Sequence, residues 1–191
     1  MKNMPNSLKQ FLRKTIIRFY NASVVKHSAS DFLKDEADLI EDATTVINEI
    51  NSICNGYDDV VENMTFAKFM SGLEKKHNVR PSQISKAVKI TEKKYTAIKA
   101  KGLDDNFDKK EMCAIAMALS LTKRESYLLT NTCGILIDPK TNVYDSVYSY
   151  MINEQCYEKD PSENVIKFYE YIEMAREFVK EETGEVRWLI K

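Results

Sequence analysis

The chain has 191 residues, of which 43% are hydrophobic and 30% are charged, and its formal net charge is −1 at pH 7. Only 5 Gly and 4 Pro are present, which disfavours turn-rich sheets and predicts an all-α protein with one substantial core or two small ones. No apolar run approaches the roughly 18 residues of a membrane span, and the N-terminus lacks the features of a secretory signal. We therefore expect a cytoplasmic protein without a membrane partner.

Residues 1–60 are predicted to form an N-terminal helical pair, a basic helix followed by an acidic one. In the first helix, apolar residues recur every three or four positions from Leu8 to Tyr20, and Ser7 and Gln10 have capping-box spacing. The apolar stripe favours packing against the next helix, while the basic surface also suits a membrane, a phosphate backbone or solvent. The basic side chains are Lys9, Arg13, Lys14 and Arg18.

The second, acidic helix is predicted from about Ser30 to Cys54, and Asn55 with Gly56 ends it. Its surface is compatible with solvation, with pairing to the basic helix, or with a basic protein partner bound through residues 31–64. The acidic side chains of this surface include Asp31, Asp35, Glu36, Asp38, Glu41 and Asp42.

Residues 61–155 are predicted to form a central domain that follows a connector from Gly56 to Met64. A helix is expected to begin near Thr65, because apolar residues then recur at helical intervals. Its core face holds Phe66, Phe69, Met70 and Leu73.

The segment from Val79 to Gly102 has the pattern of two short helices joined by a tight turn. Pro81 suits the first turn of a helix, where its missing N–H costs nothing. Ile84 and Val88 lie four positions apart and share the inner face of this helix.

The second helix of this segment is lysine-rich. Thr91 is a suitable N-cap, and Tyr95 and Ile98 point inward at a helical interval. Gly102 is expected to close the helix in the left-handed conformation. The remaining side chains, expected to face solvent or a ligand, are Glu92, Lys93, Lys94, Thr96, Ala97 and Lys99.

Two capping boxes are predicted after Gly102, formed by Asp108 with Glu111 and by Thr122 with Glu125. An aromatic amphipathic helix over 143–151 is expected to follow. Between the two boxes, one helix face is formed by Met112, Ile115, Ala116 and Leu119.

Residues 156–191 are predicted to form a C-terminal helix and a tail. The helix begins at Asp160, Pro161 and Glu163, which combine an N-cap, a first-turn proline and a capping-box carboxylate, and it ends at Gly184. The apolar tail around Trp188 is expected either to dock on the core of the chain or to form a dimer contact. The inner side of the helix holds Val165, Tyr169, Ile172 and Val179.

Together, these motifs resemble the XRE (lambda-repressor/Cro-like) helix-turn-helix family, and more closely the helix-turn-helix domains appended to other bacterial modules. The resemblance covers roughly residues 65–155 and includes the Tyr95 and Ile98 pair, the alanine-rich helix over 113–119 and the leucine pair at 128–129. It implies a compact five-helix domain with a DNA recognition helix, in a bacterial or phage protein. Family members commonly carry a phosphate-gripping Gln at the start of the second helix, where this chain has Pro81.

The charge distribution supports a DNA-binding function for this region. Residues 65–110 hold twelve Lys/Arg against five Asp/Glu, whereas residues 31–64 hold one against ten. A basic face is the expected footprint of nucleic-acid binding, because lysines near phosphates release condensed counterions. We assign contacts to Lys93, Lys94, Thr96, Lys99 and Lys101, with Gln83 and Lys86 in support. The predicted function is DNA-binding transcriptional regulation by a homodimer on double-stranded DNA.

Two alternatives remain open. The same helices are compatible with a protein-interaction or inhibitor module of a bacterial or phage conflict system, in which the acidic residues 31–64 mimic nucleic acid. An enzyme is disfavoured, because the sequence contains no phosphate loop, nucleophile elbow or metal-binding helix motif. The widely spaced cysteines predict mostly buried free thiols, with no metal or cofactor; they are Cys54, Cys113, Cys133 and Cys156.

Overall fold

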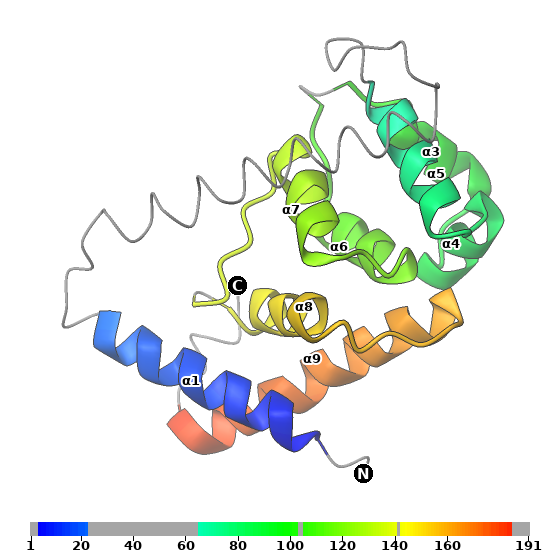
Figure 1. Cartoon of the computed structure of the whole chain (residues 1–191). Helices are drawn as coiled ribbons and strands as arrows, with labels where there is room; N and C mark the ends of the chain where they lie inside the picture. Colours follow the sequence, from blue (N-terminus) through cyan, green and yellow to red (C-terminus); the bar gives the residue numbers. More distant parts are fainter. Residues whose placement is uncertain (1–3, 23–64, 103–104, 141, 185–191) are drawn as a thin grey trace.

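The computed structural model describes residues 4–22, 65–102, 105–140 and 142–184, and every regular element in these ranges is an α-helix (Figure 1). The all-α prediction is confirmed. The predicted acidic helix, the partner region 31–64, Cys54 and the tail around Trp188 lie outside the described residues. The helices are α1 (Asn6–Ala22), α3 (Phe66–Lys76), α4 (Pro81–Val88), α5 (Glu92–Lys99), α6 (Lys109–Ala118), α7 (Lys123–Thr132), α8 (Val143–Glu154) and α9 (Pro161–Thr183).

The long helix α9 connects the two ends of the molecule. It packs against α4, α6, α8 and α1, and in Figure 1 it runs from beneath α4 to the middle of α1. Its bounds agree with the prediction, since Asp160 Oδ1 accepts the Ser162 N–H and Gly184 is left-handed, but Asp160 caps the helix through Ser162 and forms no capping box with Glu163. The predicted inner residue Tyr169 is 44% exposed, and Phe168 is fully buried instead. A shift of one residue turns a side chain by about 100° around a helix.

One hydrophobic core joins the described helices of all three predicted segments. In α1, Leu8 and Leu12 are completely buried. The centroids of the Phe11 ring and the Tyr150 ring of α8 lie 5.6 Å apart. Ser7 lies inside α1, and its hydroxyl is 2.7 Å from the Tyr150 hydroxyl. The predicted capping box at Ser7 was therefore wrong, because α1 begins at Asn6, two residues before the predicted first helical residue.

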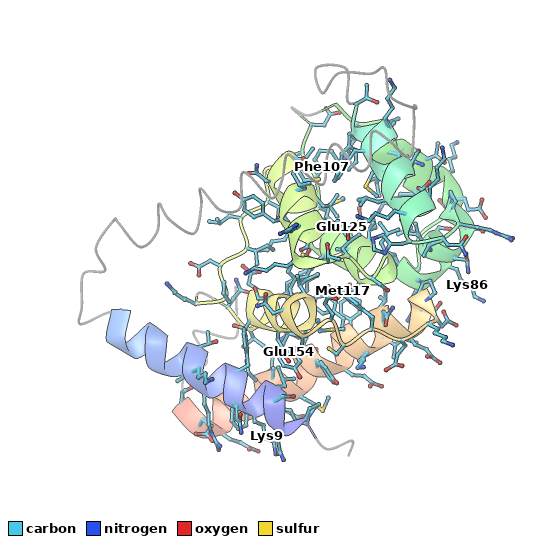
Figure 2. All side chains as sticks on the ribbon, viewed as in Figure 1. Lys9, Lys86, Phe107, Met117, Glu125 and Glu154 are labelled. Carbon is cyan, nitrogen blue, oxygen red and sulfur yellow. The ribbon has the colours of Figure 1, made fainter. Side chains whose placement is uncertain are left out.

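Helix α6 forms the centre of the core. The predicted face is buried, but every residue from Met112 to Leu119 is buried as well, because α4, α7 and α9 all pack around this helix. Its three alanines allow the neighbouring helices to approach closely. Figure 2 shows Met117 of α6 near the middle of the view.

The predicted caps of the central helices are mostly present. Asp108 Oδ1 accepts the Glu111 N–H at 2.8 Å, while the Glu111 carboxylate pairs with Lys94 and does not complete a capping box. Gly102 does not end α5 in the left-handed conformation, because the helix stops at Lys99 with Ala100 as its C-cap. The Gly102 N–H instead donates to Asp105 Oδ2 at 2.8 Å.

A buried ion cluster around Glu125, which Figure 2 labels, ties α7 to the end of α3. The Thr122 and Glu125 capping box is present as predicted. The completely buried Glu125 carboxylate also lies 3.0 Å from His77 Nε2 and 3.1 Å from Lys76 Nζ. Burial alone would raise the pKa of Glu125, but the hydrogen bonds from His77 and Thr122 outweigh it and lower the pKa to about 2.

Candidate nucleic-acid interface

Helices α4 and α5 are joined by the turn at residues 89–91. Lys89 adopts a left-handed conformation with φ 59°, and the Ile90 N–H donates to the Ser85 carbonyl at 2.9 Å. This bond ends α4 in the manner of a Schellman motif. Thr91 Oγ1 then accepts the Lys94 N–H at 3.1 Å and starts α5. Backbone and cap bonds therefore hold the angle between the two helices.

The inner face of α5 packs against α3 and is hydrogen-bonded to it. Tyr95 and Ile98 are buried, as predicted. The Tyr95 hydroxyl donates to Glu74 Oε1 at 2.7 Å, and Lys99 Nζ donates to both Glu74 oxygens at 2.8 and 2.9 Å. Burial raises the pKa of Tyr95, and the nearby Glu74 charge raises it further, so the hydroxyl stays protonated and can donate. This buried network fixes the orientation of α5.

The opposite face of α5 forms an exposed strip that contains Lys93, Thr96, Ala97 and Ala100. These residues are spaced by three or four positions, so they lie along one side of the helix. The Thr96 hydroxyl donates to the Glu92 carbonyl at 2.9 Å. The alanine side chains are small, so a ligand can approach the helix backbone closely. Lys93 is the basic group of this strip, and it forms no ion pair with any residue that the structure describes.

Four of the predicted contact residues lie at the surface of the α4 and α5 pair: Gln83, Lys86, Lys93 and Thr96. Gln83 Oε1 accepts the Arg80 N–H at 2.9 Å and so helps to cap α4. Figure 2 shows Lys86 at the outer edge of α4. Both side chains remain exposed to solvent.

The other three predicted contact residues are held by groups of the protein itself. Lys99 was expected to face outward, but it is half-buried on Glu74 because its long side chain folds back toward α3. Lys94 pairs with Glu111. Lys101 Nζ donates to the Asn106 carbonyl and lies 4.9 Å from the centroid of the Phe107 ring. These cations are partly compensated, so they contribute less to an external anion site than Lys86 or Lys93.

The sequence interpretation overlooked Arg80, which is exposed and forms the N-cap of α4. The first N–H groups of a helix point outward, and the helix dipole favours an anion at this end. A signal for this position was available, because Pro81 marks the first turn of α4 and the residue before it must be the cap.

The described part of the chain gives little support for a metal site, a membrane span or a reactive thiol. No group of three or more His, Cys, Asp or Glu residues in these ranges is arranged to hold a metal ion. None of the helices described is both long and apolar enough to cross a membrane. Cys113 and Cys133 are buried thiols, and burial raises the pKa of both, that of Cys133 to about 12. These thiols are therefore protonated and unreactive near neutral pH.

Comparison of the chain with protein-family models, with curated proteins and with solved structures found no match. The functional proposal therefore rests on the geometry and charge of α3, α4 and α5.

Proposed function

We propose that this chain is a non-catalytic transcriptional regulator that binds double-stranded DNA. In this proposal α4 and α5 act as a helix-turn-helix, and α5 is the recognition helix. The observation that best supports it is the exposed strip of Lys93, Thr96, Ala97 and Ala100 on a helix that is fixed from behind by Glu74. An α-helix fits the width of the major groove, and a strip of small side chains allows close approach to the bases.

Each residue of this surface has a chemically suitable role. Lys93 is placed to donate to guanine O6 and N7 or to a phosphate, and Thr96 and Ala97 carry methyl groups that suit a thymine methyl. Arg80 and Lys86 are assigned to backbone phosphates, together with the N-terminus of α4. Gln83 supports them by capping that end of the helix.

The electrostatics of this region also favour DNA. Residues 66–99 contain nine Lys/Arg and two Asp/Glu. One of the two acids, Glu74, is buried and paired with Lys99, so Glu92 is the exposed acid on these helices. A surface with this excess of cations attracts polyanions and makes binding depend on salt.

Fluorescence anisotropy of labelled duplexes tests the proposal. The chain is expected to bind the DNA upstream of its own gene more tightly than unrelated DNA. Replacing Lys86 and Lys93 with Gln is expected to weaken binding roughly tenfold to hundredfold, since a lost base contact is worth about 1–3 kcal/mol. Lys180→Gln is the matched control, because Lys180 is an exposed lysine near the far end of α9. Equal binding by all three proteins would contradict the proposed surface.

We also propose that the regulator is a homodimer formed through α9. Ile166 and Tyr169 are 51% and 44% exposed on this helix, and they line a groove of about 990 Å³. Basic side chains from α1 and from the C-cap of α4, and acidic side chains from α9, line the same groove. A two-fold arrangement can therefore place the acids of one copy against the bases of the other. The charged lining residues are Lys9, Arg13, Lys89, Glu170, Glu173, Glu177, Glu181 and Glu182.

Sedimentation equilibrium tests the dimer. The unmodified chain is expected to sediment as a dimer, and replacing both Ile166 and Tyr169 with Glu is expected to give a monomer, because each change places an unpaired charge in an apolar contact. Leu136→Glu is the control, since Leu136 is 79% exposed and does not line the groove. A monomeric unmodified chain, or a double variant that remains a dimer, would exclude this interface.

A further inference from the structure

A second cavity, of about 450 Å³, lies between α1, α7, α8 and the segment that leads into α8. In Figure 1 these helices occupy the side of the molecule away from α4 and α5. Cavities of about 300–1,000 Å³ commonly hold a small organic ligand. The cavity plays no part in the proposed DNA contacts.

The lining of this cavity combines an apolar floor with three lysines. Lys14 comes from α1, Lys123 from the first turn of α7 and Lys140 from the segment before α8, so three separate parts of the chain contribute one cation each. Among the residues that the structure describes, the lining contains no carboxylate. Lys14 and Lys123 form no ion pair with any residue of the described ranges. The apolar lining residues are Phe11, Ile137, Pro139 and Ile152.

Hydroxyl groups complete the wall and are already oriented by the protein. The Ser126 hydroxyl lies 2.7 Å from the buried Tyr148 hydroxyl, and the Thr130 hydroxyl donates to the Ser126 carbonyl at 3.0 Å. Thr15 donates to the Phe11 carbonyl at 2.9 Å. Because these hydrogen bonds are internal, they shape the wall, and the lysines supply the attraction for a charged group.

We propose that this cavity binds a small amphipathic anion, which consists of one carboxylate, sulfonate or phosphate group on an aromatic or aliphatic body. The body packs against Phe11 and Ile152, and the acidic group lies between Lys14 and Lys123. A neutral apolar ligand would leave Lys14 and Lys123 without a counter-ion, and a nucleic-acid backbone is too wide for a cavity of this size. The inference is independent of the proposed DNA binding.

Two dyes with the same aromatic body test the ligand class. The anionic dye 1-anilinonaphthalene-8-sulfonate is expected to bind the full chain, and Lys14→Gln and Lys123→Gln are each expected to raise its Kd roughly threefold to tenfold, as for a partly exposed charge contact. The neutral dye N-phenyl-1-naphthylamine lacks the sulfonate, so its affinity is expected to be the same for every lysine variant. Lys180→Gln, outside the cavity, is expected to change neither dye's affinity.

A variant that fills the cavity tests the location of the site. Ser149 lines the cavity and is half-buried, so Ser149→Phe is expected to remove sulfonate-dye binding while the melting temperature stays close to that of the unmodified chain. The proposal is overturned if the double variant of Lys14 and Lys123 binds the sulfonate dye as tightly as the unmodified chain. It is also overturned if both dyes weaken equally.

Competition then separates the possible sources of the anion. Displacement of the bound dye by laurate supports an aliphatic carboxylate, and displacement by adenosine monophosphate supports a nucleoside phosphate. A site that holds the dye and releases it to neither competitor supports a ligand whose acidic group is carried on an aromatic body.

Discussion

Replacing Glu74 with Ala is expected to lower the free energy of unfolding by about 3 kcal/mol. The change leaves the buried Tyr95 hydroxyl without its acceptor and the half-buried Lys99 without its counter-ion. Both groups lose contact with water on folding, so leaving either of them without a partner lowers the free energy of unfolding. Urea denaturation measures the effect.

Two further variants separate the contributions at this site. Tyr95→Phe is expected to cost only about 1 kcal/mol, because Glu74 keeps its bond to Lys99. Glu154→Ala removes an exposed carboxylate from the end of α8 and is expected to change stability by about 0.5 kcal/mol or less. If Glu74→Ala cost no more than Glu154→Ala, the buried network would not hold α5 on α3.

Replacing Glu125 with Gln is expected to remove a pH-dependent part of the stability. The pKa of Glu125 in the folded chain is about 2, below the ordinary value of 4.5. A carboxyl with a lowered folded-state pKa stabilises the protein above its unfolded-state pKa, and that contribution is lost as pH falls through the folded-state value. The difference between these two pKa values corresponds to about 3 kcal/mol of stability, which is lost as the pH falls from about 5 to about 2.

Urea denaturation at about pH 7 and about pH 3 checks this expectation. The unmodified chain is expected to lose more stability between the two pH values than Glu125→Gln, which starts lower near pH 7. Glu154→Gln serves as a control, because Glu154 is an exposed carboxylate at the end of α8. An equal loss for the unmodified chain and Glu125→Gln would show that the cluster with His77 and Lys76 does not determine acid stability.

Local sequence signals predicted most of the described helices. Proline at a first turn, as in Pro81 and Pro161, and hydroxyl or carboxylate N-caps, as in Thr91 and Asp160, act through bonds to the next few residues. Whether such a residue starts a helix therefore depends mainly on the residues next to it in the chain. The recurrence of apolar residues every three or four positions also predicted α1 and α3 correctly, because one face of each helix is buried.

The details of the candidate surface depended on contacts between residues far apart in the chain. Lys99 looked like an outward-facing lysine because Glu74, its partner on α3, lies 25 residues away. Lys94 and Glu111 likewise belong to different helices. The cavity lined by Lys14, Lys123 and Lys140 is assembled from three distant segments. No periodicity or spacing in the sequence indicates which cations meet internal acids and which face solvent.

Measurement of DNA affinity across a salt series, for the unmodified chain and for Arg80→Gln, Lys86→Gln and Lys180→Gln, tests the proposed DNA surface most directly. Log affinity is expected to fall linearly with log salt concentration, by about 0.9 per neutralised phosphate. Arg80→Gln and Lys86→Gln are each expected to reduce that slope by about 0.9, and Lys180→Gln is expected to leave it unchanged. Identical slopes for all four proteins, or no binding at low salt, would contradict DNA recognition by α4 and α5.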